Sequence, residues 1–162
     1  MAYTIDRKCD FDQVTRLLES NPCTPKIKGY DFEGIVINLP EEVGLDAVRP
    51  GGRVMLCGRA RLKFDLLGLR GDFVDSILFV ATNSRTHQTY AGKLESVPNP
   101  IRAPVPPVKN DDPELIVGVY FNPNLTKVLR LPPETAEYIV YATLGPHKSN
   151  VLRLRVGGGR TQ

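Results

Sequence analysis

The sequence contains few of the residues from which catalytic and metal sites are built. Only two of its 162 residues are histidines, His87 and His147, and it has no tryptophan. Two isolated histidines cannot make a histidine-rich metal site or a proton relay. Both lie among turn or polar residues, so we expect them at the surface. The composition disfavours an enzyme, and we expect neither catalytic residues nor a cofactor.

Cysteine is also scarce, with Cys9, Cys23 and Cys57 only. Three cysteines cannot all pair within one chain, and no two of them have the close spacing of a zinc site. We therefore expect reduced, structural thiols. A bridge between Cys9 and Cys23 is the alternative, and it would imply an oxidising compartment. Cys57 would become a nucleophile only beside a base.

Long apolar runs are missing as well. No stretch approaches the roughly 20 apolar residues that span a bilayer, and residues 1–8 do not read as a secretory leader. We expect a cytoplasmic protein, unless a signal has been removed. The net charge of +3 is modest and gives no general reason to expect a nucleic-acid or membrane partner.

What the chain does contain indicates one β-rich domain. It is 41% hydrophobic and 24% charged, as is ordinary for a globular protein, and it has 14 glycines and 14 prolines, which suit short strands joined by turns. A chain of 162 residues is long enough for one well-buried domain and short for two.

The clearest strand pattern lies near the carboxyl end. Leu152, Leu154 and Val156 alternate with Arg153 and Arg155, which places one apolar face inward and one charged face outward. Residues 138–144 are rich in β-branched and aromatic side chains, and a Gly-Pro turn follows them. We expect these two segments to pair as a hairpin.

The segment before this pair, Leu131-Pro-Pro-Glu-Thr-Ala-Glu-Tyr138, resembles the corner of immunoglobulin-like and fibronectin type III sandwiches. The resemblance is one of fold, and it covers about the last third of the chain. It implies that the Tyr138 hydroxyl bonds back to the backbone. It also implies a single antiparallel β-sandwich, which we expect to contain seven to eight strands within residues 33–156.

Two of the remaining strands carry informative patterns. Residues 53–64 alternate between an apolar face and a face that carries Arg59, Arg61 and Lys63. Residues 73–82 carry apolar side chains on both of the faces that a strand would present, which predicts a central strand covered on both sides. The other strands are expected over residues 35–39, 86–94 and 115–121.

Residues 1–32 are expected to form an arm in front of the sandwich, and residues 157–162 a tail. Within residues 10–20, Phe11, Val14, Leu17 and Leu18 fall on one face of an amphipathic helix. Such a short helix must dock, either on its own sandwich or on a neighbouring subunit. We favour the neighbour, because the linker over residues 22–28 is extended enough to reach past its own domain.

Two further segments are candidates for a functional role. Asp65, Asp72 and Asp75 cluster around one loop and are weak candidates for a calcium site, although solvated turn residues explain them as well. The proline-rich residues 97–113 form a stiff connector, with a ligand for polyproline-binding domains as the alternative.

We interpret the chain as a non-enzymatic protein-binding or self-associating module. The alternatives are a metal-dependent or enzymatic activity centred on residues 65–75, and a loop-inserting inhibitor of another protein. The two basic strand faces, one with Arg59, Arg61 and Lys63 and one with Arg153 and Arg155, lack the interleaved aromatic residues of a surface that binds single-stranded nucleic acid. The candidate partner-binding residues are Phe11, Val14, Leu17, Leu18, Arg59, Arg61 and Lys63.

Overall fold

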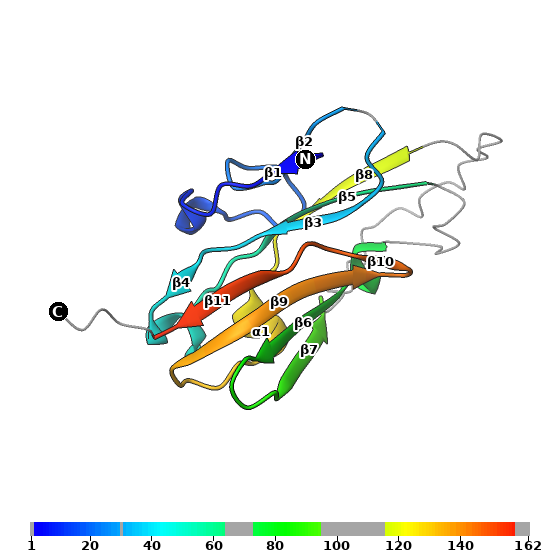
Figure 1. The fold of residues 1–162 in the computed structure, drawn as a ribbon. Coiled ribbons are helices and arrows are strands. Elements are labelled where there is room, and N and C mark those ends of the chain that lie inside the picture. The colour runs from blue at the N-terminus through cyan, green and yellow to red at the C-terminus, as the bar shows by residue number, and fades with distance from the viewer. Residues whose placement is uncertain (1, 30, 64–72, 95–115, 158–162) are drawn as a thin grey trace, which may run out of the picture.

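The computed structural model describes residues 2–29, 31–63, 73–94 and 116–157, and it is built mainly of β-strands (Figure 1). The described helical structure is short: the α-helix α1 (Leu125–Leu129) and the 3-10 turns η1 (Phe11–Gln13), η2 (Leu45–Val48) and η4 (Phe73–Ser76). The all-β class expected from the sequence is confirmed.

The smaller of the two main sheets is three-stranded and antiparallel. Its strand order is β3 (Gly34–Asn38), β5 (Cys57–Lys63) and β8 (Ile116–Phe121), so β5 lies in the centre. Gly58 of β5 faces Phe121, and a Cβ on Gly58 would lie 2.0 Å from the Phe121 ring. Only glycine leaves room for this ring against the sheet.

The larger sheet is six-stranded. Its order is β4 (Glu42–Val43), β11 (Leu152–Val156), β9 (Ala136–Leu144), β6 (Leu78–Asn83) and β7 (Thr89–Lys93), with β10 (His147–Lys148) paired to β9. The predicted pairing of the last two long strands is confirmed, since β9 and β11 are antiparallel partners.

One pair contradicts the expectation of a wholly antiparallel structure. β4 runs parallel to β11, and the Arg155 and Gly157 amides donate to the Glu41 and Val43 carbonyls at 2.9 and 2.8 Å. The chain leaves β3 in the small sheet and reaches the edge of the large sheet after Pro40. A two-residue strand carries too little pattern for its direction to be predicted.

The two main sheets contribute side chains to one common hydrophobic core. The Phe79 and Phe121 rings meet there, one from each sheet, with centroids 5.9 Å apart. Burying an aromatic side chain of this size contributes about 1.5–3 kcal/mol. The inward side chains are Ile35, Ile37, Ala60, Leu62 and Phe121 from the small sheet, and Phe79, Ala81, Tyr138, Val140, Ala142, Leu154 and Val156 from the large one.

The tyrosine corner predicted at Tyr138 is wrong in its central hydrogen bond. The Tyr138 side chain is fully buried and its ring packs edge-on against Tyr90, with centroids 6.1 Å apart. Its hydroxyl has no hydrogen-bond partner among the described residues. Burial is the main reason why the pKa of Tyr138 is raised to about 12.

Helix α1, which follows β8, has no counterpart among the elements expected from the sequence. The Asn124 side chain caps it by accepting from the Thr126 amide at 3.1 Å, and also accepts from the Val54 amide at 3.1 Å. The helix then packs on β7, where a Cβ on Gly92 would lie 2.2 Å from the Val128 carbonyl oxygen. A helix of five residues is too short to show a helical period in the sequence.

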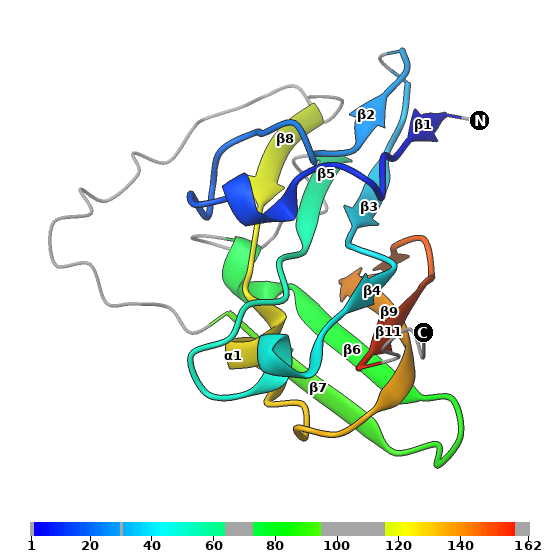
Figure 2. The same ribbon diagram turned by 90° about the vertical axis from the view of Figure 1, so that its left-hand side faces the viewer.

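The amino-terminal segment contains no α-helix in its described residues, so the helix predicted over residues 10–20 is wrong. Only η1 is helical, and the Asp10 side chain caps it by accepting from the Asp12 amide at 3.1 Å. The strands β1 (Tyr3–Thr4) and β2 (Lys26–Ile27) pair at the base of the segment. The segment lies on the small sheet, on the side away from the large sheet (Figure 2).

Candidate protein-binding loop on the amino-terminal segment

The amino-terminal segment packs on the outer face of its own small sheet through a second hydrophobic cluster. Phe11, Val14 and Cys23 from the segment are buried there with Met55 and Cys57. The side chains on one face of β5 enter the main core, as expected from their alternation in the sequence. The opposite face is not simply a basic surface, because the amino-terminal segment covers the beginning of that face.

Cys9 and Cys23 form a disulfide with a Cα–Cα distance of 5.6 Å. The expectation of three reduced thiols is therefore wrong for this pair, and the bridge weighed as the alternative is present. Because the segment is a loop and not a helix, its two limbs return to each other. Residues 9–23 are closed into a ring by the disulfide.

Cys57 is a free and buried thiol beneath this ring. Burial raises its pKa to about 11, and a 3.6 Å contact with the Asn21 side-chain oxygen only partly opposes this shift. A thiol with so high a pKa carries almost no thiolate near neutral pH. The structure thus disfavours Cys57 as a nucleophile.

Polar contacts anchor the base of the segment. The Asn38 side-chain amide donates to the carbonyls of Asp6 at 2.8 Å and Cys23 at 2.9 Å, which join the two limbs to β3. The Arg7 guanidinium donates to the Leu39 and Pro40 carbonyls at 3.0 and 3.2 Å. Hydrogen bonds of this kind typically contribute about 0.5–1.5 kcal/mol each.

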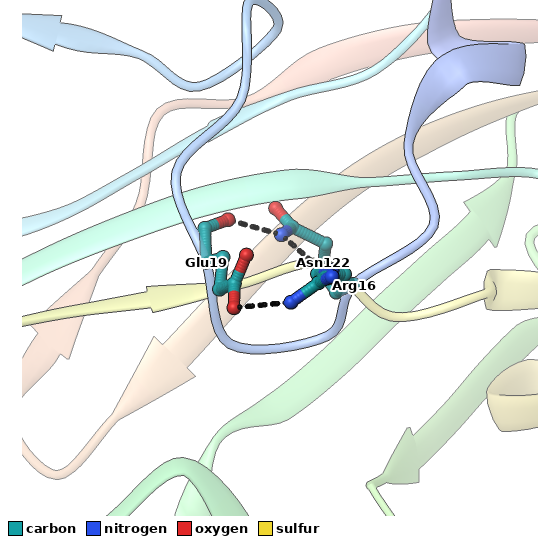
Figure 3. A network of polar contacts seen from close by, with 3 residues as sticks. All are labelled: Arg16, Glu19 and Asn122. Carbon is teal, nitrogen blue, oxygen red and sulfur yellow. Dashed lines mark hydrogen bonds and ion pairs between the residues drawn. The ribbon is translucent and has the colours of Figure 1, made fainter.

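Asn122, at the end of β8, anchors the outer turn of the segment, residues 15–20. Its backbone amide donates to the Leu17 carbonyl at 2.7 Å. Its side-chain amide donates to the Arg16 and Glu19 carbonyls, each at 2.7 Å (Figure 3). Asn122 is itself buried. One buried residue therefore fixes the backbone on both sides of the turn.

The same turn exposes two adjacent leucines. Leu17 is 44% exposed and Leu18 is 43% exposed, and Val151 at 48% is the remaining exposed large hydrophobic residue in the described chain. An exposed ion pair between Arg16 and Glu19, at 3.0 Å, flanks the leucines. We call residues 15–20 the leucine loop. It presents an apolar pair on a fixed backbone with a charged border.

The predicted partner-binding residues divide into separate groups. Phe11 and Val14 are buried against their own sheet, so only Leu17 and Leu18 are available on the leucine loop. Arg59 lies over the Tyr120 ring at 5.4 Å, and Arg61 donates to the Gly29 carbonyl at 2.7 Å. Lys63 ends β5, and its side chain lies outside the described part of the structure.

Sequence reasoning missed Asn122 as the anchor of the leucine loop. Its contacts with Arg16 and Glu19 span 106 and 103 residues of chain, so no local pattern indicates them. The available signal was weak: Asn122 begins the Asn-Pro-Asn run directly after a predicted core strand, and such a run is typical of a turn.

The candidates for metal or acid–base chemistry gain no support. Asp75 lies in η4, whereas Asp65, Asp72 and the proline-rich residues 97–113 lie outside the described residues. Within the described ranges, no three His, Cys, Asp or Glu residues gather as a metal site. His87 is exposed as expected, but His147 is half-buried, with its Nε2 atom 3.8 Å from a Glu33 carboxylate oxygen.

No described helix is long and apolar enough to cross a membrane. Comparison of the chain with known protein families, with characterised proteins and with solved structures finds no match. The function must therefore be inferred from the site itself.

Proposed function

We propose that the chain is a non-enzymatic protein-binding domain that contacts its partner through Leu17 and Leu18 of the leucine loop. The observation that carries the proposal is the anchoring of this loop by Asn122 beneath two exposed leucines. Fully burying one leucine side chain contributes about 1.5–3 kcal/mol. Because Leu17 and Leu18 are 44% and 43% exposed, a partner with an apolar pocket would gain somewhat under half of this from each leucine.

A fixed loop binds at lower cost than a mobile one. Ordering a flexible side chain at an interface costs about 0.5–1.5 kcal/mol, and ordering the backbone adds to that cost. The Cys9–Cys23 disulfide and the Asn122 hydrogen bonds order the backbone of the loop when the chain folds. The free-energy cost of ordering this backbone therefore does not arise on binding. The Arg16–Glu19 pair would then form part of a polar rim around the apolar contact.

We also propose that the two main sheets form an immunoglobulin-like sandwich. The shared core, with Phe79 against Phe121, supports this, as does the antiparallel pairing of β9 with β11. Nuclear Overhauser contacts between the two rings test the packing of the sheets. Their absence in a well-folded sample would count against a sandwich.

Self-association through exchange of the amino-terminal segment is the weaker proposal. The contacts of Phe11 and Val14 with Met55 and Cys57 are made within one chain, so an exchange would have to replace them.

A cytoplasmic location stays a prediction. The Cys9–Cys23 disulfide weighs against it, because such bonds persist mainly in oxidising compartments.

The proposal is tested by the double variant Leu17→Asp/Leu18→Asp in affinity capture from source-cell extract, quantified by mass spectrometry against the unmodified chain. We expect at least one partner that the double variant loses by about tenfold or more. Val151→Asp is the matched control, since Val151 is equally exposed but belongs to another surface. Equal capture by all three proteins would reject the leucine loop as the binding site.

A further inference from the structure

A second surface lies on the outer side of the six-stranded sheet. Along β9, Tyr138, Val140, Ala142 and Leu144 enter the core, so Ile139, Tyr141 and Thr143 face away from it. The registers place Val80 beside Tyr141 and Ala91, Leu78 beside Thr143, and Thr82 beside Ile139. We call Leu78, Val80, Ala91, Ile139 and Tyr141 the outer apolar face. Its strands β9, β6 and β7 lie side by side in Figure 1, with β11 next to β9.

This face is more apolar than an exposed antiparallel sheet usually is, because solvated sheet faces normally carry polar side chains. Val80 is only 5% exposed, yet it belongs to neither hydrophobic cluster of the described chain. The sequence predicted a strand covered on both sides here, and no described element supplies a hydrophobic cluster over the outer side.

The border of the outer apolar face is basic. Arg153 and Arg155 lie along β11, Lys93 lies on β7, and all three are exposed. Lys148 of β10 places its ammonium 4.5 Å from the centre of the Tyr141 ring. Two acidic residues of the described chain face this border: Glu137, whose carboxylate lies 3.5 Å from Arg153, and Glu42, which pairs with Arg155 in the register of β4 and β11. The four cations outnumber these two carboxylates, so the border stays basic. Cations therefore flank the apolar face on both sides.

We infer that the outer apolar face binds a protein segment whose apolar side chains are flanked by aspartate or glutamate. The charge of the border selects this occupant. A second copy of the chain is disfavoured, because a two-fold axis through the face would set basic borders against each other. This inference is independent of the leucine loop, which lies on the other main sheet.

An anionic membrane would also attract a basic border, but the apolar side chains do not suit insertion. The exposed large hydrophobics of the described chain are Leu17, Leu18 and Val151, and none of them belongs to the outer apolar face. A membrane-binding surface inserts protruding apolar side chains between lipids. A sheet face whose apolar side chains are largely shielded is suited to contact with another protein.

The test is selection of a random twelve-residue peptide library, displayed on yeast, against the purified full chain. We expect enriched peptides to carry aliphatic or aromatic residues flanked by more Asp and Glu than Lys and Arg. Synthetic copies should bind Lys93→Glu/Arg155→Glu about tenfold or more weakly, because both exposed charges are reversed. A second selection against this variant should reverse the charge preference.

Lys26→Glu/Lys127→Glu makes the same change of net charge at exposed sites on β2 and α1, and should leave binding unchanged. Leu17→Asp/Leu18→Asp should also leave it unchanged, which separates this surface from the leucine loop. No enrichment, enrichment without an acidic excess, or equal weakening by the Lys26/Lys127 variant would overturn the inference. So would tight binding to phosphatidylserine vesicles that Lys93→Glu/Arg155→Glu abolishes.

Discussion

The side-chain amide of Asn122 donates to the backbone carbonyl of Glu19 at 2.7 Å, across 103 residues of sequence. The contact joins the end of a core strand to the turn of the amino-terminal segment. Asn122→Ala removes this bond and its counterpart to Arg16, so we expect a loss of stability of about 1–3 kcal/mol and faster amide exchange in residues 15–20. Hydrogen exchange with urea unfolding measures both. Unchanged exchange in the loop would show that the Asn122 side chain does not anchor it.

Removal of the Tyr138 hydroxyl should have little effect on stability. The hydroxyl is buried without a hydrogen-bond partner among the described residues, so Tyr138→Phe removes a desolvated polar group and breaks no bond. We expect a change within about 0.5 kcal/mol, or a slight stabilisation, measured by urea unfolding near neutral pH. A loss above about 1 kcal/mol would restore the tyrosine corner expected from the sequence.

Stability should fall as the pH rises from about 9 towards 12. Burial raises the pKa of Cys57 from 9.0 to about 11 and that of Tyr138 from 10.0 to about 12. In this window the unfolded chain loses these protons before the folded chain does, so it binds fewer protons and unfolding is favoured. Urea unfolding from pH 8 to 11 measures the decline. Cys57→Ala with Tyr138→Phe should flatten it, and an equally steep decline in that variant would refute these assignments.

Reduction of Cys9–Cys23 should destabilise the protein, because the bond closes a loop with a sequence separation of 14. For a loop of this size the stabilisation is about 3 kcal/mol in the chain-entropy description. Cys9→Ser/Cys23→Ser measures the loss by thermal unfolding. Thiol counting in denaturant without reductant should find Cys57 alone, and three reactive thiols would show that the bridge does not form in the natural protein.

The long strands could be predicted because their information is local. In β9 and β11 the alternation of Tyr138, Val140 and Leu154 with charged or less buried neighbours follows directly from the pleat of a half-buried strand. The short elements could not be predicted in this way. α1 and the parallel strand β4 each depend on contacts with distant residues, such as those of Asn124 and Arg155.

The amino-terminal segment shows why the candidate site was predicted only in part. Phe11 and Val14 have helical spacing and are both buried, as a helix would bury them. Yet the disulfide and Asn122 hold the chain as a loop, so Leu17 and Leu18 point to solvent instead. Tertiary contacts outweigh the local preference of a short helix, which is marginal in water. The sequence contained the residues of the site but not their division between core and surface.

The most direct test of the leucine loop is site-specific photocrosslinking. A benzoylphenylalanine replaces Leu18 in one protein and Val151 in another, since both positions are exposed and the crosslinker reacts only with groups that touch it. Each protein is mixed with source-cell extract and irradiated, and the products are identified by mass spectrometry. The account predicts a discrete crosslinked partner from position 18 that Asn122→Ala diminishes, with none from position 151. The same products from both positions, or none from position 18, would contradict it.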